Sequence, residues 1–152
     1  MDEMKRLRHA VPETVNAIIG RRKIEVPELH KVGTDMAVPD ESVGAMMAFY
    51  ERRLAECGLE HVIFGHIGDG HLHVNVLPRT GGELEQGEEL YVEFAREAVR
   101  LGGSVAAEHG IGRIKKRFLP IQFGAEHLAA MRAVKAALDP DGILNPGVLF
   151  DA

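Results

Sequence analysis

The sequence predicts an α+β fold in which helices cover one face of an antiparallel sheet. Two β-type runs surround a glycine-rich turn between residues 61 and 77, which is typical of a β-hairpin. Apolar residues recur at helical spacing before and after this hairpin, over residues 43–57 and 83–101. Because a hairpin pairs its strands antiparallel and each helix has one apolar side, we expect the helices to share one face of the sheet.

The composition is ordinary for a globular protein of one domain. The 152 residues are 45% hydrophobic and 27% charged. A net charge of −5 argues against a nucleic-acid partner, because phosphate binding needs a basic face. The single Cys57 excludes an internal disulfide and fits a cytoplasmic location. No apolar run approaches the roughly 20 residues that span a bilayer, and no secretory segment follows Met1.

The first third of the chain is expected to form a helix, a strand and a second helix. Residues 2–19 predict a helix that is interrupted or restarted at Pro12, and residues 20–30 are polar and irregular. Residues 31–38 predict a strand. Asp40 is expected to cap the next helix. The apolar positions of that helix are Val43, Met46, Met47, Tyr50, Leu54 and Cys57.

The rest of the chain is expected to complete the sheet and to add two helices. Gly58 ends the preceding helix, and the hairpin follows with residues 68–70 at its tip. Residues 83–101 predict a helix with one apolar side. A short apolar piece, 104–107, precedes the last predicted helix at 125–138.

Histidines gather around the turn of the hairpin. Alternation along the outgoing strand puts His71, His73 and Asn75 on one face, and His66 closes the incoming strand nearby. Neutral imidazoles are good ligands for zinc and its neighbours, so histidines that converge from a hairpin suit a transition-metal site. The alternative is that these histidines decorate an exposed strand face.

A second polar group is the Glu108-His109 pair, which glycines follow directly. Glu108 would complete a metal set of two histidines and one carboxylate, and His109 would serve as a general base near neutral pH. Taken alone, the segment reads more simply as a surface loop with an incidental Glu-His pair. A third segment, residues 139–147, holds two Pro/Gly turns and predicts a compact terminal structure, or simply a chain end.

These three segments, in this order and at these separations, resemble the C-terminal domain of the FAD-linked oxidases. The family includes D-lactate dehydrogenase, D-2-hydroxyglutarate dehydrogenase and the flavin subunit of glycolate oxidase, and its patterns read approximately GHxGDGNxHxN, GGxxxxEHGxG and DPxxxLNPG. The matching segments are GHIGDGHLHVN (65–75), GGSVAAEHGIG (102–112) and DPDGILNPG (139–147), and GTDMAVP (33–39) looks like the strand that precedes them. The resemblance covers essentially the whole chain. It implies that residues 1–152 form a single portion of the C-terminal (cap or substrate) domain.

The resemblance implies a flavin-dependent oxidoreductase that acts on the CH–OH group of a 2-hydroxy acid such as D-lactate, glycolate or D-2-hydroxyglutarate. It implies that His66, His73 and Glu108 bind a divalent metal ion, zinc or manganese. It also implies that His109 removes a proton from the substrate while hydride leaves for the flavin. The metal ion would orient the substrate, His109 would take its proton, and the flavin would accept the hydride.

Other residues are expected to contact the substrate and the cofactor. By the same resemblance, Arg8 and Asn75 bind the substrate, and Asn145 approaches the flavin. The chain departs from the family at His71, where the family usually has asparagine. This change leaves the polarity of the pocket open.

The resemblance also implies partners. The family's flavin-binding domain precedes this region and is far longer than the residues available before Arg8. We therefore expect that this domain is absent from the chain, that a separate flavin-binding domain or subunit holds most of the FAD, and that the chain alone is inactive. The open surface where that domain would dock is expected to favour self-association into a homo-oligomer.

Two other interpretations belong to different classes. The His71-x-His73 pair in an apolar strand suggests a nucleotide hydrolase of the histidine-triad kind, but that family needs a further histidine where this chain has Asn75. A non-catalytic remnant or interaction domain is the second alternative. Metal analysis distinguishes it, because a pure interaction domain has no reason to hold an ion at the predicted site.

Overall fold

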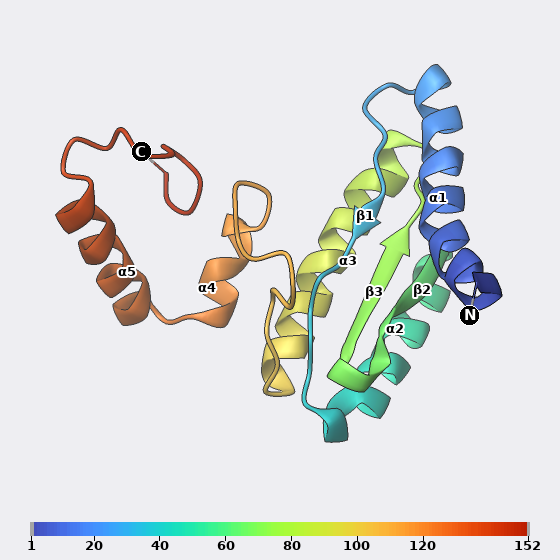
Figure 1. Ribbon diagram of the computed structural model, residues 1–152, viewed down its shortest axis with the longest axis horizontal. Helices are drawn as coiled ribbons and strands as arrows, with labels where there is room; N and C mark the ends of the chain where they lie inside the picture. The colour runs from blue at the N-terminus through green and yellow to red at the C-terminus, as the bar shows by residue number, and fades with distance from the viewer. Residues whose placement is uncertain (1, 152) are drawn as a thin grey trace.

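The structure is a computed structural model that describes residues 2–151, and it consists of a small sheet with helices around it (Figure 1). The strands pair antiparallel in the order β1-β3-β2. The α+β prediction is confirmed. The strands are β1 (Val32–Gly33), β2 (His61–His66) and β3 (His71–Val76). The helices are α1 (Asp2–Glu25), α2 (Val43–Cys57), α3 (Gly81–Arg100), α4 (Leu119–Gln122) and α5 (Ala125–Leu138).

The main core lies between one face of the sheet and helices α2 and α3. Strand β3 alternates as predicted, so that Val74 and Val76 are buried in this core. The rings of Tyr50 on α2 and Phe94 on α3 meet edge to face, with their centroids 4.7 Å apart. His71 lies on the opposite face of β3. The strand thus presents apolar side chains to the core on one face and polar side chains on the other.

Replacing Phe94 with alanine tests how much this core stabilises the fold. Phe94 is 1% exposed, so the change leaves a cavity, and we expect the free energy of unfolding to fall by about 3–5 kcal/mol. Chemical denaturation followed by circular dichroism measures the loss. Val134→Ala is the control, because that side chain is 61% exposed and its loss should cost less than about 0.5 kcal/mol. Equal losses in both variants would place the core elsewhere.

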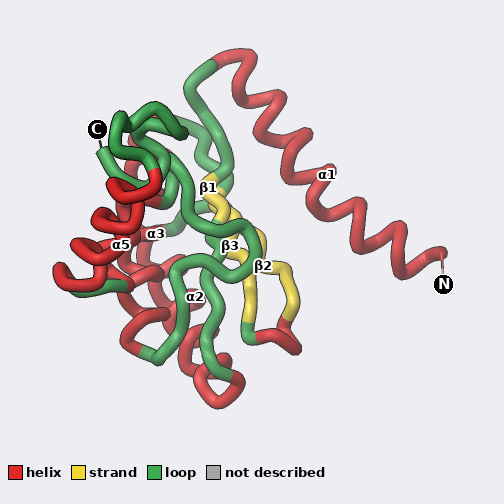
Figure 2. Tube along the Cα trace, turned by 60° about the vertical axis from the view of Figure 1, so that its left-hand side comes forward, coloured by secondary structure: helices red, strands yellow, loops and turns green. Residues whose placement is uncertain are grey.

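Helix α1 is longer than the sequence predicts, since it continues through Pro12 and ends at Glu25. Its last turns are fixed by tertiary contacts, which local sequence patterns do not report. Val15 and Ile19 are buried against the second sheet face, so the helices cover both faces and not one face as predicted. Arg22 Nη2 donates a 2.7 Å hydrogen bond to Glu60. The first half of α1 projects away from the body of the protein (Figure 2).

The first strand is shorter than predicted, and Asp40 does not act as a helix cap. The regular ladder ends after Gly33, because the Val74 N–H donates to the Thr34 hydroxyl in place of a backbone carbonyl, and the chain pairs with β3 again at the isolated bridge between Ala37 and His71. Asp40 instead begins a 3₁₀ turn that precedes α2. Further along, Thr80 caps α3 by accepting a hydrogen bond from the Glu83 N–H, so this helix begins two residues earlier than expected.

The hairpin tip depends on one glycine. Residues 67–69 form a 3₁₀ turn, and Gly70 closes it with a φ of +59°. A side chain at Gly70 would also collide with the carbonyl oxygen of Val38, so both the backbone conformation and the available space require glycine.

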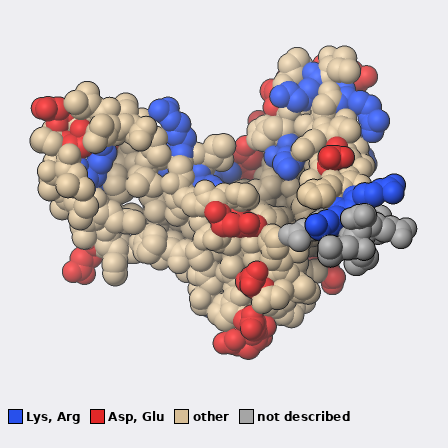
Figure 3. All heavy atoms as spheres, viewed as in Figure 1, with Lys and Arg blue, Asp and Glu red and all other residues tan. Residues whose placement is uncertain are grey.

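Helix α5 and the C-terminal segment form a lobe beside α4 (Figure 1). In the space-filling view, an indentation lies between this lobe and the part of the molecule that contains the sheet (Figure 3). Within residues 2–151, no helix combines the length and the apolar character needed to cross a membrane.

Candidate metal and proton-transfer site

One carboxylate oxygen lies among three imidazole rings. Glu108 Oε1 is 3.4 Å from His66 Nε2, 3.3 Å from His71 Nδ1 and 3.2 Å from His73 Nε2. The structure therefore brings Glu108 to both of the histidines with which it was predicted to bind metal. It adds His71, whose role the sequence left open.

The hairpin places the three histidines. His66 and His71 are direct partners in the β2–β3 ladder, and His73 lies opposite Phe64 two positions further along the same face. The rings of His71 and His73 are in contact, with centroids 4.2 Å apart. The site is buried on one side and open on the other. His71 is buried, whereas the side chains of His66 and Glu108 are 39% and 42% exposed.

A backbone contact decides which nitrogen of His73 is available for a ligand. His73 Nδ1 lies 2.5 Å from the carbonyl oxygen of Thr34, which can only accept, so Nδ1 carries the proton. In the neutral ring, Nε2 then presents a lone pair to the Glu108 carboxylate. Two acceptors face each other in that state, and a positive charge between them, from a second proton or a metal ion, satisfies both. The hydrogen bond with His73 also lowers the pKa of Glu108.

Asp35 holds the loop that carries Glu108 and His109. Its carboxylate accepts hydrogen bonds from the backbone N–H groups of Glu108 (3.3 Å) and His109 (3.2 Å), and its carbonyl oxygen accepts one from Ala107 (2.8 Å). The Lys115 ammonium pairs with the same carboxylate. Burial raises the pKa of Asp35, but the hydrogen bonds from Lys115 and from the loop outweigh it, and the pKa is lowered overall.

Asp35 and Lys115 were missed in the sequence analysis. Asp35 is an acidic residue within a segment that otherwise reads as an apolar strand. A carboxylate buried there needs charged or hydrogen-bonding partners, and this requirement was the available signal.

Burial and a neighbouring histidine act together on His71. Removal from water and the nearby His73 ring lower the pKa of His71, although the carboxylates of Asp35 and Glu108 oppose the shift. The ring therefore favours its neutral form, which is the form that binds metal.

His109 lies beside this cluster and is exposed. Its ring centroid is 5.9 Å from that of His73. Two compact groups have ligand atoms within 4.8 Å of one another: Asp35, His71 and His73, and His73, Glu108 and His109. His66 belongs to neither group, although its ring centroid lies 5.9 Å from that of His71 and its Nε2 lies 3.4 Å from Glu108 Oε1.

The other predicted site residues lie outside the histidine cluster or outside the described side chains. Asn75 is buried on the same strand face as His73, and its amide lies 3.5 Å from the His73 carbonyl. Asn145 is exposed in the C-terminal lobe with a φ of +46°. The side chain of Arg8 lies outside the described part of the structure.

The C-terminal turn is organised by Asp139. Its carboxylate accepts hydrogen bonds from the backbone N–H groups of Ile143 and Leu144, both at 3.0 Å, and pairs with Lys135. Lys116 donates to the Gly147 carbonyl oxygen at 3.3 Å. The neighbouring Lys115 binds Asp35. Two adjacent lysines therefore contact the C-terminal turn and the carboxylate that holds the loop of Glu108 and His109.

The pH dependence of stability tests the Asp139 contacts. The hydrogen bond from Lys135 and those from the backbone lower the pKa of Asp139, although burial opposes them. A folded-state pKa below the unfolded value of about 3.9 means that the carboxylate stabilises the fold above about pH 4. That contribution disappears as the pH falls through the folded pKa. We expect the melting temperature of Asp139→Asn to lie below that of wild type at pH 7, and the difference to shrink as the pH falls below about 4 toward the folded pKa. A constant difference would contradict this assignment.

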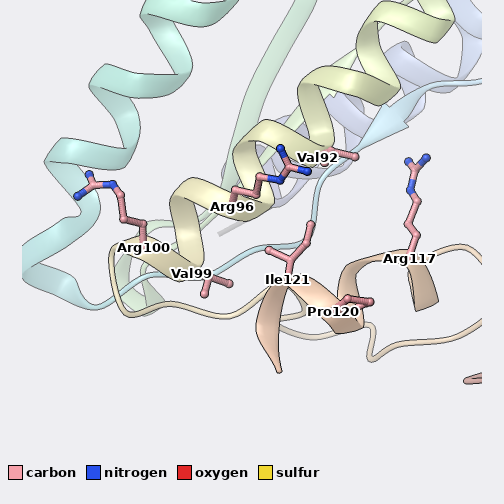
Figure 4. Close-up of a pocket in the computed structure, with 7 residues that line it drawn as sticks. All are labelled: Val92, Arg96, Val99, Arg100, Arg117, Pro120 and Ile121. Carbon is pink, nitrogen blue, oxygen red and sulfur yellow. The ribbon is translucent and has the colours of Figure 1, made fainter. Parts of the chain in front are cut away.

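The larger hollows of the described surface are lined by other residues. One of about 610 Å³ lies between α3 and α4 and is lined by Val92, Arg96, Val99, Arg100, Arg117, Pro120 and Ile121 (Figure 4). Another, of about 770 Å³, lies within the C-terminal lobe. The histidine cluster lines neither of them.

Residues 4–149 match the family described as FAD linked oxidases, C-terminal domain. The chain belongs to this family. The match includes all three motif segments, and the resemblance inferred from them is confirmed.

Curated relatives carry related names. The chain is 36% identical over 118 residues to the glycolate oxidase subunit GlcD of Bacillus subtilis, which covers 76% of this chain and 25% of that protein. It is 45% identical over 94 residues to D-2-hydroxyglutarate dehydrogenase of Xanthomonas citri, covering 59% and 20%. A mitochondrial D-lactate dehydrogenase [cytochrome] of Saccharomyces cerevisiae is 32% identical over 117 residues, covering 77% and 20%. The chain thus spans about a quarter or less of the length of these relatives.

Proposed function

We propose that this chain supplies the metal-binding, substrate-binding and proton-abstracting residues of a flavin-dependent 2-hydroxy-acid dehydrogenase. The observation that supports this most directly is the Glu108 carboxylate, which lies 3.4 Å from His66 and 3.2 Å from His73 with His109 beside it. Relatives named for glycolate, D-lactate and D-2-hydroxyglutarate support the substrate class.

His66, His73 and Glu108 are proposed to hold a divalent ion, zinc or manganese. Two imidazoles and a carboxylate suit either metal. When bound, such an ion supplies a Lewis acid that orients the hydroxyl and carboxylate of a 2-hydroxy acid. The hydrogen bond from His73 Nδ1 to the Thr34 carbonyl keeps Nε2 directed toward the ion.

His109 is proposed to accept the hydroxyl proton of the substrate. Its ring is exposed and lies beside Glu108, so a substrate that reaches the metal ligands also reaches this imidazole. Arg8 is proposed to hold the substrate carboxylate, and Asn75 is proposed to contact the substrate. FAD would supply the acceptor for the hydride that leaves the substrate carbon, and Asn145 is proposed to approach that flavin.

A flavin-binding domain or subunit is the proposed partner. Around the site, Ile67 at the hairpin tip is 67% exposed and Ile114 beyond the Glu-His loop is 80% exposed. Apolar side chains on both sides of a polar site favour a docked partner, or self-association when that partner is missing. The single Cys57 is the support for a cytoplasmic location.

The direct test mixes the purified 152-residue chain with FAD and records absorbance and 2-hydroxy-acid oxidation. We expect colourless protein without activity, because contacts at Asn145 and the Glu-His loop are too few to offset the entropy lost when FAD binds. Activity should appear when the flavin-binding domain of a relative is added. Stoichiometric yellow, active protein from the chain alone would refute the division of the site. A chain that binds neither metal nor a flavin domain would favour a non-catalytic interaction domain.

A further inference from the structure

We propose that His71 is a further ligand of the same metal ion, so that three imidazoles and one carboxylate hold it and zinc is bound in preference to manganese. This inference rests on the proposed metal site at His66, His73 and Glu108, and it concerns a residue to which the family motif gives no role in metal binding.

The first observation is that His71 is buried without hydrogen bonds. Its side chain is 4% exposed, and Nε2 has no hydrogen-bond partner among the described residues. Nε2 does lie 3.3 Å from Asp35 Oδ1, but not in the direction that a hydrogen bond needs. A buried imidazole with an unpaired nitrogen requires a specific explanation, and an ion held at its other nitrogen, Nδ1, would account for the burial of the ring although it would not itself pair Nε2.

Asp35 does not supply that explanation. Its carboxylate already accepts two backbone hydrogen bonds from the Glu-His loop and pairs with Lys115. The charge on Asp35 is therefore compensated without His71. The nitrogen of His71 that remains for a ligand is Nδ1, which faces Glu108.

The second observation is the separation between His71 and Glu108. His71 Nδ1 is 3.3 Å from Glu108 Oε1, which falls between the corresponding distances for His66 and His73. Two ligand atoms of a tetrahedral zinc site with bonds of about 2.0–2.1 Å lie about 3.3–3.4 Å apart. Each imidazole thus lies at this spacing from the carboxylate oxygen, and one ion bound by all of them would also draw His66 and His71 into a common group with Glu108, which the two compact groups with ligand atoms within 4.8 Å do not yet form.

A third imidazole changes which metal the site prefers. Imidazole nitrogen suits zinc, copper and nickel, whereas manganese is better matched by carboxylate, carbonyl and water oxygens. Adding His71 to the two histidines therefore favours zinc, while the asparagine that the family usually carries here would add an oxygen or no ligand. The site then discriminates between the two metals that the predicted set of three residues leaves open.

Nitrogen NMR of the unaltered chain tests the proposal directly. We expect zinc, but not magnesium, to shift the imidazole ¹⁵N resonances of His66 Nε2, His71 Nδ1 and His73 Nε2, with one ion bound per chain. Shifts confined to His66 and His73 would overturn the inference and leave the proposed metal site standing. No histidine shift at all would overturn both. Because this measurement needs no substitution, it does not depend on how any variant folds.

Metal competition gives the second measurement. His71→Asn should weaken zinc binding by about 10-fold or more and manganese binding by much less, so the ratio of the two Kd values changes. His61→Asn is the matched control, since it removes an exposed imidazole from the same hairpin and should leave both Kd values unchanged. An unchanged zinc-to-manganese ratio in His71→Asn would contradict the proposal.

Discussion

Replacing Glu108 with glutamine is expected to weaken zinc binding by more than about 100-fold. Glu108 Oε1 lies within 3.4 Å of nitrogens from His66, His71 and His73, and the change removes its charge while keeping its shape. A titration against a chromophoric chelator measures the loss. The effect should exceed that of any single histidine, because this carboxylate approaches all three imidazoles.

Glu126→Gln is the control for this experiment. Glu126 is also an exposed acidic residue, but it lies in the first turn of α5 and away from the hairpin. Its substitution should leave zinc affinity unchanged. If Glu108→Gln binds zinc as tightly as wild type, then the ion does not lie at this carboxylate, and the compact group of Asp35, His71 and His73 becomes the site to examine.

The second large effect is expected for His109→Ala in the complete flavin-containing enzyme. Loss of a general base should lower kcat by about 10²–10⁴-fold while the metal content stays near one ion per chain. His127→Ala, which removes an exposed imidazole from α5, should change neither quantity.

The ratio of the two losses identifies the role of His109. Because its ligand atom lies within 4.8 Å of those of His73 and Glu108, His109 is also close enough to act as a ligand. A parallel loss of metal and turnover would make it one. Loss of turnover alone would support the role of proton acceptor.

The hairpin and its polar face could be predicted from the sequence because both depend on local rules. Alternation assigns His71, His73 and Asn75 to one face wherever β3 pairs, and the glycine-rich turn fixes the register that sets His66 opposite His71. Helices α2 and α5 were predicted for a similar reason, since their apolar spacing and their end signals agree.

The missed features depend on contacts between distant segments. The bond from the Glu108 N–H to Asp35 joins residues 73 positions apart, and no periodic pattern reports it. The extra turns of α1 likewise depend on Arg22 reaching Glu60. The three family motifs identified the residues near Glu108, but motif spacing carries no information on Lys115 or on the buried state of His71.

The loop that carries Glu108 and His109 differs mechanically from the hairpin that carries the histidines. The hairpin is held by a continuous ladder, whereas the backbone of residues 107–109 is held by hydrogen bonds to Asp35, and the Glu108 side chain adds its contacts with the histidines. Opening this loop therefore breaks fewer backbone hydrogen bonds than unfolding the sheet, and we expect it to cost less free energy. Any ion that bridges Glu108 to the histidines must raise that opening energy, so the amide protons of Glu108 and His109 become slow to exchange with solvent when it binds. The domain can in this way lose its reactive loop and regain it without refolding.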